Sequence, residues 1–204
     1  MKQNTALKRT SVLFITQAAV IAALYVVLSM LSELLGLCSG VIQCRISEAL
    51  TILPAFFASA IPGLYVGCLL TNLISSATIW DIIFGPVATL IGALVTYLIG
   101  RAVRSKALPK KDDVTATDKI SALRIVILTI MFALPPIIAN ALIIPPVLKF
   151  GTGLDDAFWF IVVTVTAGEI IACGIFGGIL LASLLRNRAT RSLLFNNDKK
   201  KGIA

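Results

Sequence analysis

The chain has 204 residues, of which 58% are apolar and 14% are charged, and its mean hydropathy is +0.97. Because a soluble domain is about 45–50% apolar and about 25% charged, these values exclude an ordinary soluble domain and a disordered chain. They favour one polytopic membrane domain over residues 1–204.

The residue inventory also excludes several kinds of chemistry. The chain has no histidine, which excludes histidine acid–base catalysis and Ser-His-Asp triads. It has no phosphate-binding GxxxxGK loop, so ATP bound to this chain does not drive it. Its four cysteines form no CxxC pair, so we expect no metal and no cofactor. Cys38 and Cys44 could form a disulfide if both lie outside the cell, but free thiols are the preferred interpretation.

Uncharged stretches predict the membrane spans. Residues 49–80 carry no charge, and as one straight helix they would run about 48 Å, against a hydrocarbon core of about 30 Å. Pro54 lies inside this stretch and Pro62 is followed by Gly63, so we interpret it as a hairpin of two helices. The six predicted spans are residues 11–31, 46–59, 63–77, 82–100, 125–147 and 157–185.

The basic residues indicate the orientation of these spans. All 18 of them except Arg45 and Lys149 lie before the first span, in the loop 101–124 or in the tail 186–204. The positive-inside rule places these three segments in the cytoplasm, which requires an even number of crossings between them. We therefore predict an all-α integral membrane protein, a six-helix bundle with both termini cytoplasmic. The basic segments are interpreted as topology determinants and not as sites for nucleic acid.

Polar side chains inside apolar spans are costly, so they mark a candidate functional site. Five such groups come from five predicted helices, and all lie in the outer half of the membrane or at its midplane. Glu169 lies about 18 Å below the outer start of its span. This pattern predicts a pocket open to the outside with Glu169 at its floor. The candidate groups are Glu48, Asn72, Asp81, Asn140 and Glu169, with Gln43 and Arg45 beside Glu48.

Structural roles are the alternative for several of these residues. Arg45 and Glu48 are three positions apart and could simply pair with each other, and Asp81 could cap its helix. Trp80 and Trp159 fit an aromatic belt at the outer interface. A second interpretation makes Trp80, with Phe84 one turn below it, a stacking wall over a planar ligand.

The charge balance of the outer half indicates the ligand. Acidic residues outnumber the two basic residues there, which disfavours an anionic substrate and favours a neutral or cationic one. Carboxylates and amides beside an aromatic ring suit a planar heterocycle with N–H donors. A guanine-like edge has two adjacent N–H donors that one carboxylate accepts together.

Small residues on the first span predict a helix-packing face. Ala18 and Ala22, and likewise Ala19 and Ala23, are four positions apart, a spacing that lets another helix approach closely. The turn after the second span is apolar yet is predicted to face the cytoplasm, so a partner would cover it. Packing inside the bundle is the alternative. The predicted docking surface for a second membrane protein comprises Ala18, Ala19, Ala22, Ala23, Phe56, Phe57 and Pro62.

Two motifs resemble a known family. Residues 40–54, GVIQCRISEALTILP, are similar to the QxRxSEAL…P signature of QueT-type queuosine-precursor transporters. Residues 81–89, DIIFGPVAT, resemble the DxxFGxxAT stretch of the same family. The resemblance covers nearly the whole chain, and Cys44 departs from it where an aromatic residue is expected.

The resemblance implies the substrate-binding component of an energy-coupling-factor importer in the bacterial plasma membrane. The implied substrate is a deazapurine, 7-aminomethyl- or 7-cyano-7-deazaguanine. The implied partners, apart from the lipid bilayer, are a transmembrane coupling protein and two cytoplasmic ATPases. By analogy, Ala18, Ala19, Ala22 and Ala23 would meet the coupling protein.

Three alternatives remain open from the sequence. The bundle could serve another vitamin-like planar substrate, or it could be a stand-alone carrier that uses Glu169 as an ion site. An intramembrane enzyme is disfavoured by the missing histidines.

Overall fold

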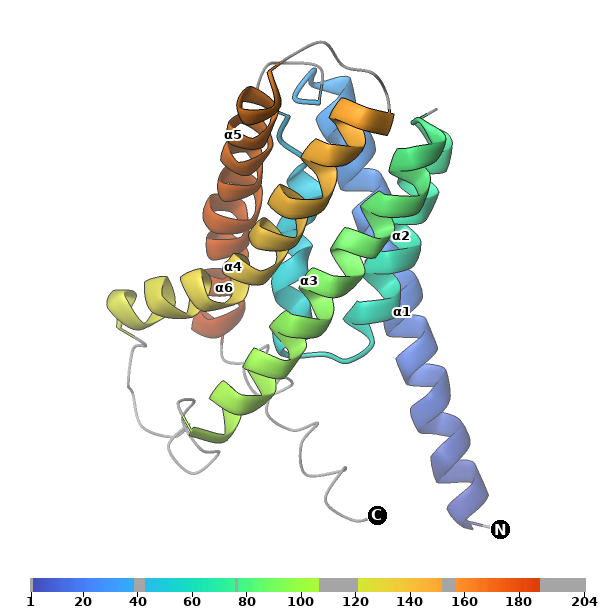
Figure 1. The fold of residues 1–204 in the computed structure, drawn as a ribbon. Coiled ribbons are helices and arrows are strands. Elements are labelled where there is room, and N and C mark those ends of the chain that lie inside the picture. The colour runs from blue at the N-terminus through green and yellow to red at the C-terminus, as the bar shows by residue number, and fades with distance from the viewer. Residues whose placement is uncertain (1, 39–42, 76, 107–120, 152–156, 188–204) are drawn as a thin grey trace.

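The computed structural model describes residues 2–38, 43–75, 77–106, 121–151 and 157–187, and all of its regular elements are helices (Figure 1). This confirms the predicted all-α class. In chain order the elements are α1 (Lys2–Leu34), the 3-10 helix η1 (Ile46–Ala55), α2 (Ala60–Ile74), α3 (Ile79–Lys106), α4 (Ala122–Pro146), the π-helical η3 (Val147–Gly151), α5 (Phe158–Glu169), the π-helical η4 (Ile170–Phe176) and α6 (Gly177–Arg186).

Four of the described helices are long and apolar enough to cross a membrane. Helix α4 continues directly into η3, and α5, η4 and α6 follow one another without a break. The two remaining apolar helices, η1 and α2, are shorter. The four candidate spans are Ser11–Leu34, Ile79–Val103, Ala122–Gly151 and Phe158–Arg186.

The uncharged stretch 49–80 is broken, as the sequence predicts, but its first half is not an α-helix. Hydrogen bonds of the 3-10 type continue to the end of η1, where the Phe56 amide donates to the Leu53 carbonyl over 2.9 Å. Pro54 has no amide to donate within the last turn, and Pro62 lies in the first turn of α2, where no donor is required. At about 2.0 Å per residue, η1 spans about 20 Å, against about 15 Å for an α-helix of the same length.

The 3-10 helix η1 is the central element of the bundle. Every residue from Ser47 to Ala55 is buried. Two apolar clusters meet on it: Ile52 and Ala55 pack with α4 and α6, whereas Leu50 and Leu53 pack with α1 and α2. Its partners on the other helices include Tyr25, Leu64, Ala93, Ile125, Phe132 and Leu181.

Glycines let α3 approach its neighbours closely. A Cβ atom on Gly100 would lie 2.4 Å from the Ala55 backbone, and one on Gly92 would lie 2.7 Å from the Pro136 backbone. Contacts that close exclude any side chain at these two positions. Helix α3 therefore packs backbone to backbone on η1 and on α4, which keeps the buried 3-10 helix enclosed.

Gly36 ends α1 and turns the chain back toward η1. Its φ of 71° is in the left-handed region that favours glycine. The Leu37 amide donates to the Ser32 carbonyl over 2.9 Å, which closes a Schellman-type helix end. The returning segment is joined to α1, because the Ile46 amide donates to Ser32 Oγ over 2.9 Å and Ser29 Oγ donates to Ser47 Oγ over 2.7 Å.

The helix ends divide between two ends of the bundle (Figure 1). The start of α1, the end of α3, the start of α4 and the end of α6 lie at one end, which we call the basic end because it carries Arg101, Arg124 and Arg186. The start of η1, the end of α2 and the start of α5 lie at the opposite end.

Candidate binding site

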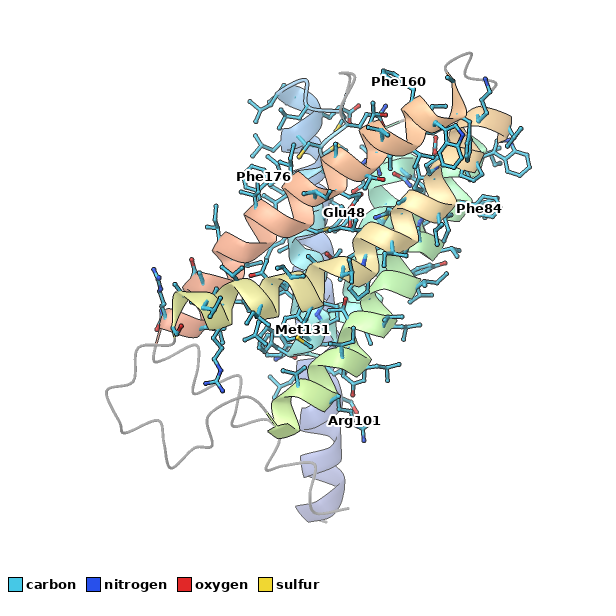
Figure 2. The ribbon with its side chains drawn as sticks, turned by 60° about the vertical axis from the view of Figure 1, so that its left-hand side comes forward. Glu48, Phe84, Arg101, Met131, Phe160 and Phe176 are labelled. Atoms are coloured by element: carbon cyan, nitrogen blue, oxygen red, sulfur yellow. The ribbon has the colours of Figure 1, made fainter. Side chains whose placement is uncertain are left out.

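Glu48 is the buried acidic residue at the centre of the bundle (Figure 2). It lies in the first turn of η1 and its side chain is 3% exposed. The Tyr25 hydroxyl donates a hydrogen bond to Glu48 Oε1, while Oε2 is buried and has no hydrogen-bond partner among the described residues. A buried carboxylate oxygen without a partner is a position where a ligand donor would be strongly favoured.

Asn72 connects three segments beside Glu48. Arg45 Nη1 donates to Asn72 Oδ1 over 3.2 Å, and Asn72 Nδ2 donates to the Asp81 backbone carbonyl over 2.8 Å. A Cβ atom on Gly85 would lie 2.7 Å from Asn72 Nδ2. The glycine therefore provides the space in which the amide joins α2, α3 and the segment before η1.

A second carboxylate lies next to Glu48. The nearest ligand atoms of Glu48, Glu169 and Cys173 all lie within 4.8 Å of one another. Cys173 Sγ donates to Glu169 Oε2 over 3.3 Å. Asn140 lies beside Glu169, and its Nδ2 is buried without a hydrogen-bond partner of standard geometry. We call Glu48, Glu169, Cys173 and Asn140 the acidic cluster.

The helix that carries Glu169 changes geometry at that residue. Helix α5 ends at Glu169 and the π-helical η4 begins at Ile170. A π turn widens the helix and is frequent at functional sites. Here it directs both Glu169 and Cys173 toward η1, where Thr51 Oγ1 lies 3.5 Å from Cys173 Sγ. Gly168 permits the close approach, since its Cβ would overlap the Gln43 backbone carbonyl at 2.0 Å.

The structure does not bring all the predicted site residues together. Gln43 reaches the cluster region through its backbone, and its side chain is exposed. The Asp81 carboxylate accepts a hydrogen bond from Thr78 Oγ1 over 2.7 Å at the start of α3. The Asp81 amide donates to Thr78 Oγ1 over 3.4 Å, so Thr78, and not Asp81 as the alternative expects, is the residue that caps this helix. It is the Asp81 backbone carbonyl that bonds to Asn72.

Trp80 and Phe84 are stacked on each other at the end of the bundle opposite the basic end. Their ring centroids lie 6.1 Å apart at 22°, and Trp80 is 45% exposed. Gly151 packs on the indole, because a Cβ atom there would lie 2.8 Å from Trp80 Cγ. In Figure 2, Phe84 lies at the edge of the bundle, away from Glu48. Trp159 is 74% exposed.

Several residues of the site were missed by the sequence reasoning. Tyr25, Ser29 and Ser32 lie on one face of α1, and this polar face on an otherwise apolar helix is a signal that could have identified them. Thr51 and Cys173 carry no such signal. Cys38 and Cys44 are free thiols, and partial burial raises the pKa of the Cys38 thiol, with Arg45 nearby acting in the opposite direction.

The alanines of α1 divide into two pairs. Ala22 is 6% exposed, and the Ala18 and Ala22 carbonyls lie against Gly63 and Gly67 of α2. Ala19 and Ala23 are exposed. In the turn before α2, Phe56 is 3% exposed and packs edge-on to Phe132 at 5.9 Å and 80°. The other two predicted interface residues of this turn, Phe57 and Pro62, are half-buried.

Comparison with known proteins identifies the class. Residues 15–186 match the family model described as QueT transporter, so the chain belongs to the QueT transporter family. A curated relative from Lactococcus lactis subsp. cremoris, described as queuosine precursor transporter QueT, is 34% identical over 85 residues. That alignment covers 42% of this chain and spans half the length of the relative. No solved structure matches.

The chain belongs to a transporter family, which agrees with its four long apolar helices. The protein is therefore a membrane protein and not an enzyme.

Proposed function

We propose that the protein captures a queuosine precursor, a 7-deazaguanine base, from outside a bacterial cell. It would do so as the substrate-binding component of an energy-coupling-factor importer. Membership of the QueT transporter family, and the description of the Lactococcus relative as a queuosine precursor transporter, support the substrate class. The observation that carries the proposal is a pair of buried atoms in the acidic cluster, Glu48 Oε2 and Asn140 Nδ2, which have no hydrogen-bond partner of standard geometry among the described residues.

These two atoms match the edge of a guanine-type base. Such an edge has two adjacent N–H donors beside a carbonyl acceptor. The Glu48 carboxylate would accept from the donors, and the Asn140 amide would donate to the carbonyl. Each unsatisfied buried polar group costs about 1–3 kcal/mol, so a ligand that pairs both groups gains specificity as well as affinity.

The second carboxylate extends the match to a cationic substituent. Glu169 lies beside Glu48 with Arg45 nearby, and neither Glu48 nor Glu169 forms an ion pair of standard length in the described part of the chain. The two carboxylates of Glu48 and Glu169 face the single guanidinium of Arg45, which leaves one negative charge in excess. The ammonium group of an aminomethyl substituent would neutralise that charge. Glu48 and Asn140 are buried, so the substrate would reach them only after the segments that cover them separate.

We infer six crossings with both termini in the cytoplasm. The basic end of the bundle carries the start of α1, the end of α3, the start of α4 and the end of α6, which supports an even number of crossings between these points (Figure 1). Helices η1 and α2 would form the second and third crossings, packed inside the bundle. The acidic cluster would then open toward the end opposite the basic end.

Docking to a transmembrane coupling protein, itself bound to two ATPases, would supply the energy. The exposed alanines Ala19 and Ala23 offer a surface on which a second helix can pack closely. The turn with Phe57 and Pro62 lies at the same end of the bundle as Arg101 and would extend that surface.

Calorimetry on the purified protein tests the substrate. The panel is 7-aminomethyl-7-deazaguanine, 7-cyano-7-deazaguanine, guanine, thiamine and riboflavin. We expect tight binding of a deazaguanine and no heat from thiamine or riboflavin. Tight binding of a vitamin instead would keep the capture role and overturn the substrate.

A stand-alone carrier is the second candidate, because Glu169 is a half-buried carboxylate next to the buried carboxylate of Glu48. Uptake by vesicles that hold this protein alone, with an ion gradient and without ATP, would favour it. No uptake without the partner proteins would support the importer.

A further inference from the structure

A lateral groove on the apolar surface lies outside the candidate binding site. It has a volume of about 480 Å³ and runs between α4 on one side and η4 with α6 on the other. Ile130 and Ile137 line it from α4, and Ile170 and Ile179 line it from the opposite wall. Thr129 contributes a hydroxyl, but that hydroxyl already donates to the Ile125 carbonyl over 2.9 Å. The groove therefore suits an apolar occupant.

The length of the groove matches half a bilayer. Its lining runs from Ile125 to Ile137 along α4 and from Ile170 to Ala182 on the other wall. The α4 stretch rises about 18 Å, against about 15 Å for one leaflet of a hydrocarbon core about 30 Å thick. An acyl chain of a phospholipid has the shape and the apolar surface to fill such a groove.

Positive charge lies at one end of the groove. Arg186 follows Ala182 by one helical turn and is exposed at the end of α6, and Arg124 immediately precedes Ile125 and is exposed at the start of α4. Ile125 and Leu185 belong to one apolar cluster, so the two helix ends that carry these arginines lie close together. Basic side chains between membrane helices on the cytoplasmic side bind anionic head groups.

We propose that this groove binds an anionic phospholipid of the cytoplasmic leaflet. One acyl chain would lie between α4 and α6, and the phosphate would lie at the basic end with Arg186 and Arg124. We favour a lipid because the positive charges of Arg186 and Arg124 at one end of the groove complement a phosphate group. A partner helix or a second copy of this chain would not need a phosphate-binding end.

Gly174 gives a variant that fills the groove without disturbing the fold. It lines the groove, and the nearest atom to an added Cβ is Ile170 Cγ2 at 3.9 Å. Gly174→Leu would therefore place its side chain in the acyl position and also raise helix propensity. Its thermal unfolding temperature should equal or exceed that of the wild type, which separates loss of lipid from loss of fold.

Native mass spectrometry of the purified full chain provides the test, with phosphatidylglycerol and phosphatidylcholine of identical acyl chains as probes. We expect the wild type to retain phosphatidylglycerol preferentially. Arg186→Gln should bind it about fivefold more weakly, and Arg124→Gln should act in the same direction. Gly174→Leu should lose both lipids.

Arg101→Gln is the matched control, because Arg101 is exposed at the basic end but lies on α3, away from the groove (Figure 2). It should leave lipid binding unchanged. Unchanged binding in Gly174→Leu would overturn the groove as the lipid site, and equal retention of the two lipids would overturn the head-group assignment. A wild-type dimer that Gly174→Leu dissociates would replace the lipid with a second copy.

Discussion

The Tyr25 hydroxyl donates a hydrogen bond to Glu48 across the interface between α1 and η1. Both side chains are buried, and Tyr25 is 0% exposed. This contact holds the Glu48 carboxylate in one orientation, and Oε2 has no hydrogen-bond partner within the described part of the chain.

Replacing Tyr25 with phenylalanine leaves Glu48 Oε1 without a donor. The free energy of unfolding should fall by about 1–3 kcal/mol, because a buried acceptor loses its partner. Substrate affinity should fall as well, since the carboxylate is no longer oriented. Thermal unfolding in detergent and calorimetry measure the two effects. Tyr65→Phe, at a half-buried tyrosine of α2, is the control and should change neither. A Tyr25→Phe protein as stable as the wild type would contradict the role of this hydrogen bond.

Glu48→Gln removes the charge and keeps the shape of the side chain. A charge-assisted hydrogen bond contributes about 1.5–3 kcal/mol, so the affinity for the deazaguanine should fall about 10–100-fold. Titration calorimetry measures it. Glu33→Gln, which removes an exposed carboxylate near the end of α1, should bind like the wild type. Equal losses in the two variants would show that the overall negative charge matters more than this site.

Gly85→Ala would place a Cβ atom 2.7 Å from Asn72 Nδ2. The amide must move, which breaks its hydrogen bond to the Asp81 carbonyl and weakens the contact with Arg45. We expect the free energy of unfolding to fall by about 1–3 kcal/mol, measured by denaturation in detergent. Gly174→Ala is the matched helical glycine with open space, and it should be neutral or stabilising by up to about 1 kcal/mol. Similar destabilisation of the two variants would exclude the Asn72 contact as the cause.

Ala19→Trp should stop ATP-driven uptake while leaving substrate binding intact, because Ala19 is exposed and a larger side chain there would obstruct a docking helix without reaching the acidic cluster. Uptake into vesicles reconstituted with the partner proteins, together with calorimetry, distinguishes the two effects. Leu24→Trp, on another exposed face of α1, is the control and should transport normally. Loss of binding in Ala19→Trp would instead assign Ala19 to internal packing.

The sequence by itself determined the helical class and the break within residues 49–80. The reason is local: proline lacks a backbone donor wherever it occurs, and a run of uncharged residues needs no tertiary context to be recognised. It also predicted that Glu48, Asn140 and Glu169 lie near one another, because an ionisable or amide group in an apolar span must find a polar neighbour, and the structure places these three side chains together. The six-crossing topology and the roles of these residues in binding remain predictions.

Only the tertiary structure decided the rotation of each helix and the local departures from α geometry. The 3-10 form of η1 and the π turns at 147–151 and 170–176 depend on packing against neighbours, not on intrinsic preference. Rotation separates Ala19 on the surface from Ala22 against α2, and it buries Phe56 beside Phe132. It also brings Tyr25 and Cys173 to Glu48 from 23 and 125 residues away, contacts that no sequence spacing encodes.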